Sequence, residues 1–127
     1  MQIQVDSVQI KGREMRVRFT CEWGAGEARW VGPTPKPESK HDVEIDVAKE
    51  LKWGTAIRLT LESQPLIATT IDGNRIIAQL EAVELDGTAA IRLGSSLILV
   101  DAVGEPLAPG SWVQVRTPDL VLYPFTL

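Results

Sequence analysis

Three carboxylates alternate with apolar residues in the stretch HDVEIDV, residues 41–47: Asp42, Glu44 and Asp46. Carboxylates can bind a metal ion or exchange protons with a substrate, and both roles need oxygen atoms that converge on one point. Same-face residues on a strand repeat at about 6.6–6.8 Å. Calcium binds its oxygens at about 2.3–2.6 Å, so two of its ligands span at most about 5 Å. A metal site here would therefore need further ligands from elsewhere in the chain.

The same spacing is also typical of the solvent face of a strand. Arg16 and Arg18 recur with the same period in EMRVRF, residues 14–19, and an antiparallel neighbour that carries them would pair with the three carboxylates. We therefore expect a structural, salt-bridged strand face. An exposed acidic patch for a basic partner is the second interpretation, and a metal site is the third.

The single cysteine, Cys21, and the single histidine, His41, are the only candidates for a thiol–imidazole dyad. The alternation of residues 14–23 places Cys21 on the apolar face between Phe19 and Trp23, where burial opposes thiolate formation. Zinc and non-haem iron sites draw on several histidines and cysteines. No glycine motif for phosphates or dinucleotides occurs in the sequence. The sequence thus predicts no catalytic residue, no metal and no cofactor, and a carboxylate pair remains the one route to an enzyme.

Tryptophan is unusually frequent among the aromatic residues: there are four Trp against two Phe and one Tyr. Each of Trp23, Trp30, Trp53 and Trp112 lies within two residues of a glycine, which predicts positions at strand ends, on the rims of the fold. Two interpretations of the indoles follow. Either they plug the ends of the core while each N–H reaches a turn carbonyl, or they form, with Arg29, a rim that binds a protein, a sugar or a single-stranded nucleic acid.

Alternating apolar and polar residues recur along the whole chain and are separated by turn signals. This pattern predicts about ten short strands, with at most one helical turn at 48–54, in a single domain spanning residues 1–127. The predicted fold class is all-β, a small antiparallel β-barrel or β-sandwich. The alternation changes phase at Asp6–Ser7 and at Glu81–Ala82, which predicts two β-bulges and favours a curled sheet.

Two segments depart from simple alternation. The run LILVDAV, residues 97–103, has so few polar residues that we expect it to be buried on both faces. Pro124 lies within the last apolar run, and because proline cannot donate to a ladder it predicts an edge strand there.

The chain carries 13 Lys and Arg against 17 Asp and Glu, a net charge of −4. This balance disfavours duplex nucleic acid, whose binding depends on cations that neutralise phosphates, and it suits a basic partner. The sequence opens without a basic, apolar leader, and its longest apolar run is too short to span a bilayer. A lone cysteine fits a reducing compartment. We expect a cytoplasmic protein without a membrane partner, and a homo-oligomer remains open.

The function most consistent with these features is a non-catalytic protein-binding module, such as an acidic accessory, inhibitor or immunity-type protein that acts on a basic partner. The alternative is a binder of small ligands, oligosaccharides or single-stranded nucleic acid through a Trp-lined barrel rim. An enzyme that uses a carboxylate pair is the third hypothesis.

Overall fold

The computed structural model describes residues 1–125. Over these residues it contains twelve β-strands and no helix. The strands are β1 (Gln2–Lys11), β2 (Glu14–Cys21), β3 (Gly24–Trp30), β4 (Lys40–Val47), β5 (Leu51–Lys52), β6 (Ile57–Leu59), β7 (Leu66–Thr70), β8 (Gly73–Val83), β9 (Thr88–Leu93), β10 (Ser96–Val103), β11 (Trp112–Thr117) and β12 (Leu120–Pro124). The protein is therefore all-β, as its alternating pattern predicts. No helix in the described part of the chain is long and apolar enough to cross a bilayer.

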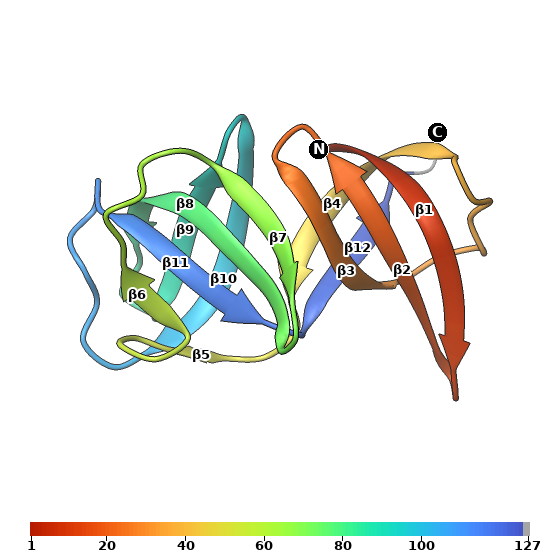
Figure 1. Ribbon diagram of the computed structural model, residues 1–127. Helices are drawn as coiled ribbons and strands as arrows, with labels where there is room; N and C mark the ends of the chain where they lie inside the picture. The colour runs from red at the N-terminus through yellow and green to blue at the C-terminus, as the bar shows by residue number, and fades with distance from the viewer. Residues whose placement is uncertain (126–127) are drawn as a thin grey trace.

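Five strands close into a small barrel, which lies on the right of Figure 1. The order around it is β12–β4–β1–β2–β3, and a short parallel pairing between β3 and β12 completes the ring. Inward residues at every second position fill this barrel, among them Val5, Phe19 and Ile45, all of which are buried. One face of each strand is apolar, and closure of the ring turns these faces toward one another, so they form the core of the barrel.

The remaining strands, β5 to β11, form a second curled group on the left of Figure 1. Its longest strand, β8, pairs with β7 and β9 and also with β11. β9 also pairs with β10, and β5 pairs with the end of β10. A single bridge between Trp53 and Ile57 connects the end of β5 to β6, which in turn pairs with β11. Leu80, Ile91 and Val113 are among the buried residues of this group.

Both predicted bulges are confirmed. The register of β1 on β2 shifts between Val5 and Ser7, and that of β8 on β9 shifts between Leu80 and Ala82. An extra residue in one strand reverses the parity of everything after it, so a phase change in the sequence marks the position directly.

Three local predictions are wrong. Residues 48–54 contain β5 and turns instead of a helical turn. The run 97–103 is buried on one face only, through Ile98, Val100 and Ala102, while its other face is exposed. β12 is not an edge strand, because it pairs with β4 on one side and β3 on the other.

The reason that β12 accommodates a proline lies in its register. Leu122 is the last residue of β12 that pairs with β3, and Pro124 lies beyond it, opposite Val43 of β4. The N–H of Phe125 donates to the carbonyl of Asp42 at 2.9 Å, so odd-numbered residues bond toward β4. An N–H at position 124 would point away from β4, toward the side of β3. Because the pairing of β3 with β12 ends at Leu122, the proline costs no ladder bond.

Candidate functional site

The acidic face, which we define as Asp42, Glu44 and Asp46, lies on the outer side of β4, with Asp42 and Glu44 exposed. The predicted pairing with the two arginines is wrong, because β1 lies between β2 and β4. Arg16 Nε instead donates to Glu27 Oε1 at 3.0 Å, and Arg18 Nε lies 4.0 Å from Glu27 Oε2, both across the β2–β3 pair.

No Lys or Arg nitrogen among residues 1–125 lies within 4.0 Å of a carboxylate oxygen of the acidic face. Across the sheet, Asp42 faces Gln2 and Glu44 faces Tyr123. Asp46 Oδ1 accepts the N–H of Val47 at 2.9 Å. Within the described chain no three His, Cys, Asp or Glu side chains are grouped to hold a metal ion. Over residues 1–125 the acidic face is thus a run of negative charge with no cation within 4.0 Å.

Cys21 and His41 do not form a dyad. Both are cross-strand neighbours of Ile3, on opposite sides of β1, so two inter-strand spacings, about 10 Å, separate their backbones. The His41 ring lies edge-on to Trp30 with 4.9 Å between ring centroids.

His41 has a different hydroxyl partner, Ser39, whose Oγ lies 2.7 Å from His41 Nε2. The Ser39 hydroxyl also donates to the carbonyl of Lys36 at 2.5 Å. Because a hydroxyl has one proton to donate, Nε2 must be the donor toward Ser39. A histidine that activates a serine has to accept the hydroxyl proton of that serine. The Ser39–His41 pair therefore stabilises the local turn and does not activate Ser39 as a nucleophile.

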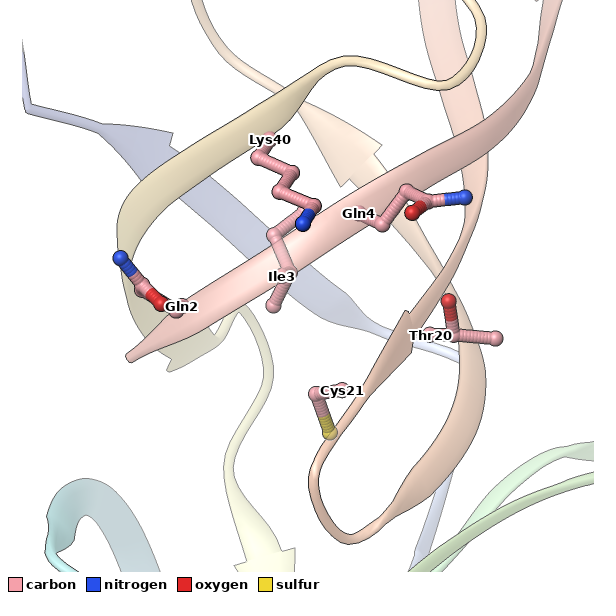
Figure 2. Close-up of a pocket in the computed structure, with 6 residues that line it drawn as sticks. All are labelled: Gln2, Ile3, Gln4, Thr20, Cys21 and Lys40. Atoms are coloured by element: carbon pink, nitrogen blue, oxygen red, sulfur yellow. The ribbon is translucent and has the colours of Figure 1, made fainter.

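Cys21 lines a hollow of about 240 Å³ together with Gln2, Ile3, Gln4, Thr20 and Lys40. Figure 2 shows Lys40 reaching across β1 from β4, while Thr20 and Cys21 lie on β2 at the opposite side. Burial raises the pKa of the Cys21 thiol above its ordinary value, and the nearby backbone N–H groups of Trp23 and Gly24 only partly oppose this effect. The thiol is therefore protonated at neutral pH and is a poor nucleophile.

The structure does not bring the four tryptophans together on one rim. Trp23 precedes β3 and Trp30 ends it, so they lie at opposite ends of the barrel. Trp30 and Trp53 are only 4% and 7% exposed, and the indole N–H of Trp30 donates to the carbonyl of Pro33 at 2.9 Å. Trp23 and Trp112 are half-buried.

Trp23 and Arg29 have specific neighbours that limit their use as a free surface. A methyl group on Gly94 would lie 2.0 Å from the ring of Trp23, so this indole rests directly on the β9–β10 turn. Arg29 faces Arg16 across the β2–β3 pair, and its Nε is buried with no hydrogen-bond partner in the described residues. These contacts make Trp23 and Trp30 part of the packing of the fold.

β10 carries an exposed apolar surface, although its sequence predicted burial on both faces. Leu97, Leu99 and Val103, which we call the β10 strip, are 43%, 51% and 41% exposed. They point outward because Ile98, Val100 and Ala102 point into the core of the second group. Leu97 and Leu99 follow each other on this face, and Asp101 separates them from Val103. Exposed apolar side chains grouped on one strand are typical of a surface that meets another molecule.

β10 also has an open edge beside this strip. A two-residue turn at 94–95 joins β9 to β10, so Leu93 and Ser96 form a hydrogen-bonded pair and even-numbered residues of β10 bond to β9. The N–H of Ala102 donates to Gly87 on that side, whereas the carbonyl of Val103 accepts from Trp53 on the other side. The N–H and C=O groups of Leu97 and Leu99 therefore point away from β9.

The edge that carries these groups faces β4 without bonding to it. β5 pairs with β10 only at Ala102 and Val103, and no backbone hydrogen bond joins β4 to β10 within residues 1–125. Between the two strands lies a groove of about 240 Å³, which we call the β4–β10 groove. Its lining residues come from both parts of the fold: Met1, Val43, Glu44, Ile45, Ser95, Ser96, Leu97, Ile98 and Phe125.

The class of protein that these observations define is a small all-β protein with a closed five-stranded barrel and further strands. No protein-family model matches this chain, and no curated protein or solved structure matches it significantly.

Proposed function

We propose that this protein is a non-catalytic binding module that recognises another protein through the β10 strip and the adjoining acidic face. The observation that carries the proposal is the exposure of Leu97, Leu99 and Val103 on one face of one strand. Exposed apolar side chains release water when a partner covers them, and this release is the main favourable term in protein association.

The charges around the strip favour a basic partner. Asp101 lies on the same outer face of β10, and Glu44 lines the neighbouring groove. Complementary charge raises the rate of association and selects against acidic partners. A free, half-buried Cys21 is compatible with a reducing compartment, so we propose the cytoplasm as the site of action.

Affinity capture with matched variants tests the proposal. The wild-type protein should retain a specific partner that Leu99→Lys loses, because a lysine in the strip adds charge where the partner must exclude water. Leu61→Lys makes the same chemical change at a leucine that is fully exposed outside the strip, and it should retain the partner. The proposal is wrong if both variants retain the same set of proteins as the wild type, identified by mass spectrometry.

A further inference from the structure

We infer that the protein partner anchors on this surface through one arginine side chain, which inserts into the β4–β10 groove and pairs with Glu44. This inference rests on the proposed function and names the residue of the partner that the surface would recognise.

The size of the groove restricts its occupant to a single side chain. Cα atoms of β4 and β10 come within 8 Å of each other, whereas two strands that both bond to a third lie about 9.5 Å apart. A further strand therefore does not fit between them. The groove holds about 240 Å³, the volume of roughly eight water molecules in the liquid. This is room for one long side chain.

The charge of the groove favours a cation. Glu44 is exposed and lines the groove, and no cationic nitrogen lies within 4.0 Å of its carboxylate among residues 1–125. Asp42 is exposed on the same face of β4, two residues away. The α-amino group of Met1 also lies at the groove, but it donates to the Val43 carbonyl at 2.9 Å. Two carboxylates thus stand against one amino group, and a basic side chain of a partner complements them.

Apolar side chains frame the Glu44 carboxylate and suit the stem of an arginine. The N–H of Phe125 donates to the Asp42 carbonyl at 2.9 Å, so these two residues are direct cross-strand neighbours. Glu44 is then the diagonal neighbour of Phe125 on the same face. Leu97 lines the groove from β10. Because Phe125 and Leu97 are 61% and 43% exposed, an inserted side chain would remove apolar surface from water on both sides.

Unpaired backbone carbonyls supply further acceptors at the groove. The carbonyl of Leu97 points away from β9, toward β4. Even-numbered residues of β4 bond to β12, as the bond from Ala48 N–H to the Asp119 carbonyl shows, so the carbonyl of Ile45 points toward the groove. Neither carbonyl has a backbone partner in residues 1–125. N–H groups lie on the same two strand edges, so the Glu44 carboxylate, and not the backbone, selects the sign of the charge.

An arginine meets these groups better than a lysine does. Its planar guanidinium stacks on aromatic faces, and the exposed ring of Phe125 lines the groove. Its five N–H donors can bond a carboxylate and neighbouring carbonyls at the same time, whereas the ammonium of a lysine has three. The combination of a carboxylate, a ring and two free carbonyls therefore specifies a guanidinium.

Capped single residues test the anchor on the full-length protein. N-acetyl-arginine N-methylamide should shift the amide resonances of Ile45, Ser96 and Leu97 in NMR spectra, with a Kd on the order of millimolar. The citrulline compound has nearly the same shape but no charge, and it should bind at least about threefold more weakly. The lysine compound should bind at least about twofold more weakly. Shifts confined to other surfaces, or equal binding of arginine and either analogue, would overturn the inference.

A change of one carboxylate to an amide tests the role of Glu44. Glu44→Gln should bind the arginine compound about threefold more weakly and should lose the preference for arginine over citrulline. Glu84→Gln makes the same change at an exposed glutamate of the β8–β9 turn, which does not line the groove, and should bind as the wild type does. If Glu44→Gln keeps the wild-type preference for arginine over citrulline, the inference is wrong.

A change of the ring at position 125 tests the stacking. Phe125→Leu keeps an apolar wall but removes the aromatic face, and its cost to the fold is small because the side chain is 61% exposed. The arginine compound should bind this variant about two- to fivefold more weakly, and the preference for arginine over lysine should disappear. An unchanged preference would contradict the choice of arginine.

Affinity capture separates the anchor from the proposed function. Glu44→Gln should retain less of the captured partner than the wild type, whereas Glu84→Gln should retain the same amount, because only the first change removes a charge that the arginine meets. If Glu44→Gln retains the partner at the wild-type level while Leu99→Lys loses it, the proposed function stands and the arginine anchor is wrong.

Discussion

The side-chain amide of Asn74 takes the place of a backbone partner for Glu27. Asn74 Oδ1 accepts the N–H of Glu27 and Asn74 Nδ2 donates to its carbonyl, both at 2.8 Å. The same Nδ2 also donates to the carbonyl of Thr117 at 3.2 Å. Because Asn74 is the second residue of β8 while Glu27 lies in the middle of β3, one buried amide joins the barrel to the second group of strands.

The variant Asn74→Ala should therefore destabilise the whole protein. It leaves the backbone N–H and carbonyl of Glu27 without partners at a buried junction, and we expect the free energy of unfolding to fall by about 2–4 kcal/mol. Urea denaturation followed by tryptophan fluorescence measures this change. Asn74→Asp keeps the acceptor but loses the donor and places a carboxylate near two carbonyls, so it should be at least as destabilising. A loss below about 0.5 kcal/mol would contradict the role of this amide.

A second point of contact between the two parts depends on a glycine. Gly24 has φ of +133°, and a methyl group there would lie 2.0 Å from the carbonyl oxygen of Ile67, with which it pairs. Gly12 has φ of +63° with open space around it. We expect Gly12→Ala to cost about 1 kcal/mol from backbone conformation alone, and Gly24→Ala to cost about 1–3 kcal/mol more because β3 and β7 must separate. Equal losses in urea denaturation would show that the β3–β7 contact contributes nothing.

The strands and both bulges could be predicted because they depend on local alternation, which the sequence displays directly. The partners of Arg16 and Arg18 could not, because strand order is set by long-range pairing and β1 intervenes between β2 and β4. The exposure of the β10 strip could not be predicted for the same reason. Residues 97–103 are apolar enough for a strand buried on both faces, and only the arrangement of the surrounding strands shows that the face with Leu97 and Leu99 is uncovered. Which backbone groups face an open edge depends on which strands lie side by side, and local alternation does not determine that order.

The Cys21 thiol should make stability depend on alkaline pH. Burial raises its pKa above the ordinary value of 9.0, so the folded protein holds this proton more tightly than the unfolded chain does. Its contribution is fully present below pH 9.0 and is lost as pH rises through the higher pKa of the folded state. Urea denaturation at neutral and alkaline pH should show this decline for the wild type.

Cys21→Ala is the control, because it removes the titrating group and should flatten the decline while other groups continue to titrate. Alkylation gives an independent measure: the thiol should react more slowly in the folded protein than in urea at neutral pH. An identical alkaline decline in wild type and Cys21→Ala would contradict the assignment to this thiol.

Two glutamates of the barrel, Glu27 on β3 and Glu44 on β4, differ in whether they have a cationic partner. Glu27 binds Arg16 at 3.0 Å on a partly buried surface, so Glu27→Gln should lower the free energy of unfolding by about 1 kcal/mol. Glu44 is exposed between Asp42 and Asp46 and has no cation within 4.0 Å in the described chain. Glu44→Gln removes repulsion without breaking a bond, so stability should stay the same or rise slightly, and any rise should shrink in salt. If Glu44→Gln instead destabilises the protein as much as Glu27→Gln, the acidic face serves the fold itself; if it does not, its charge is free to meet a partner.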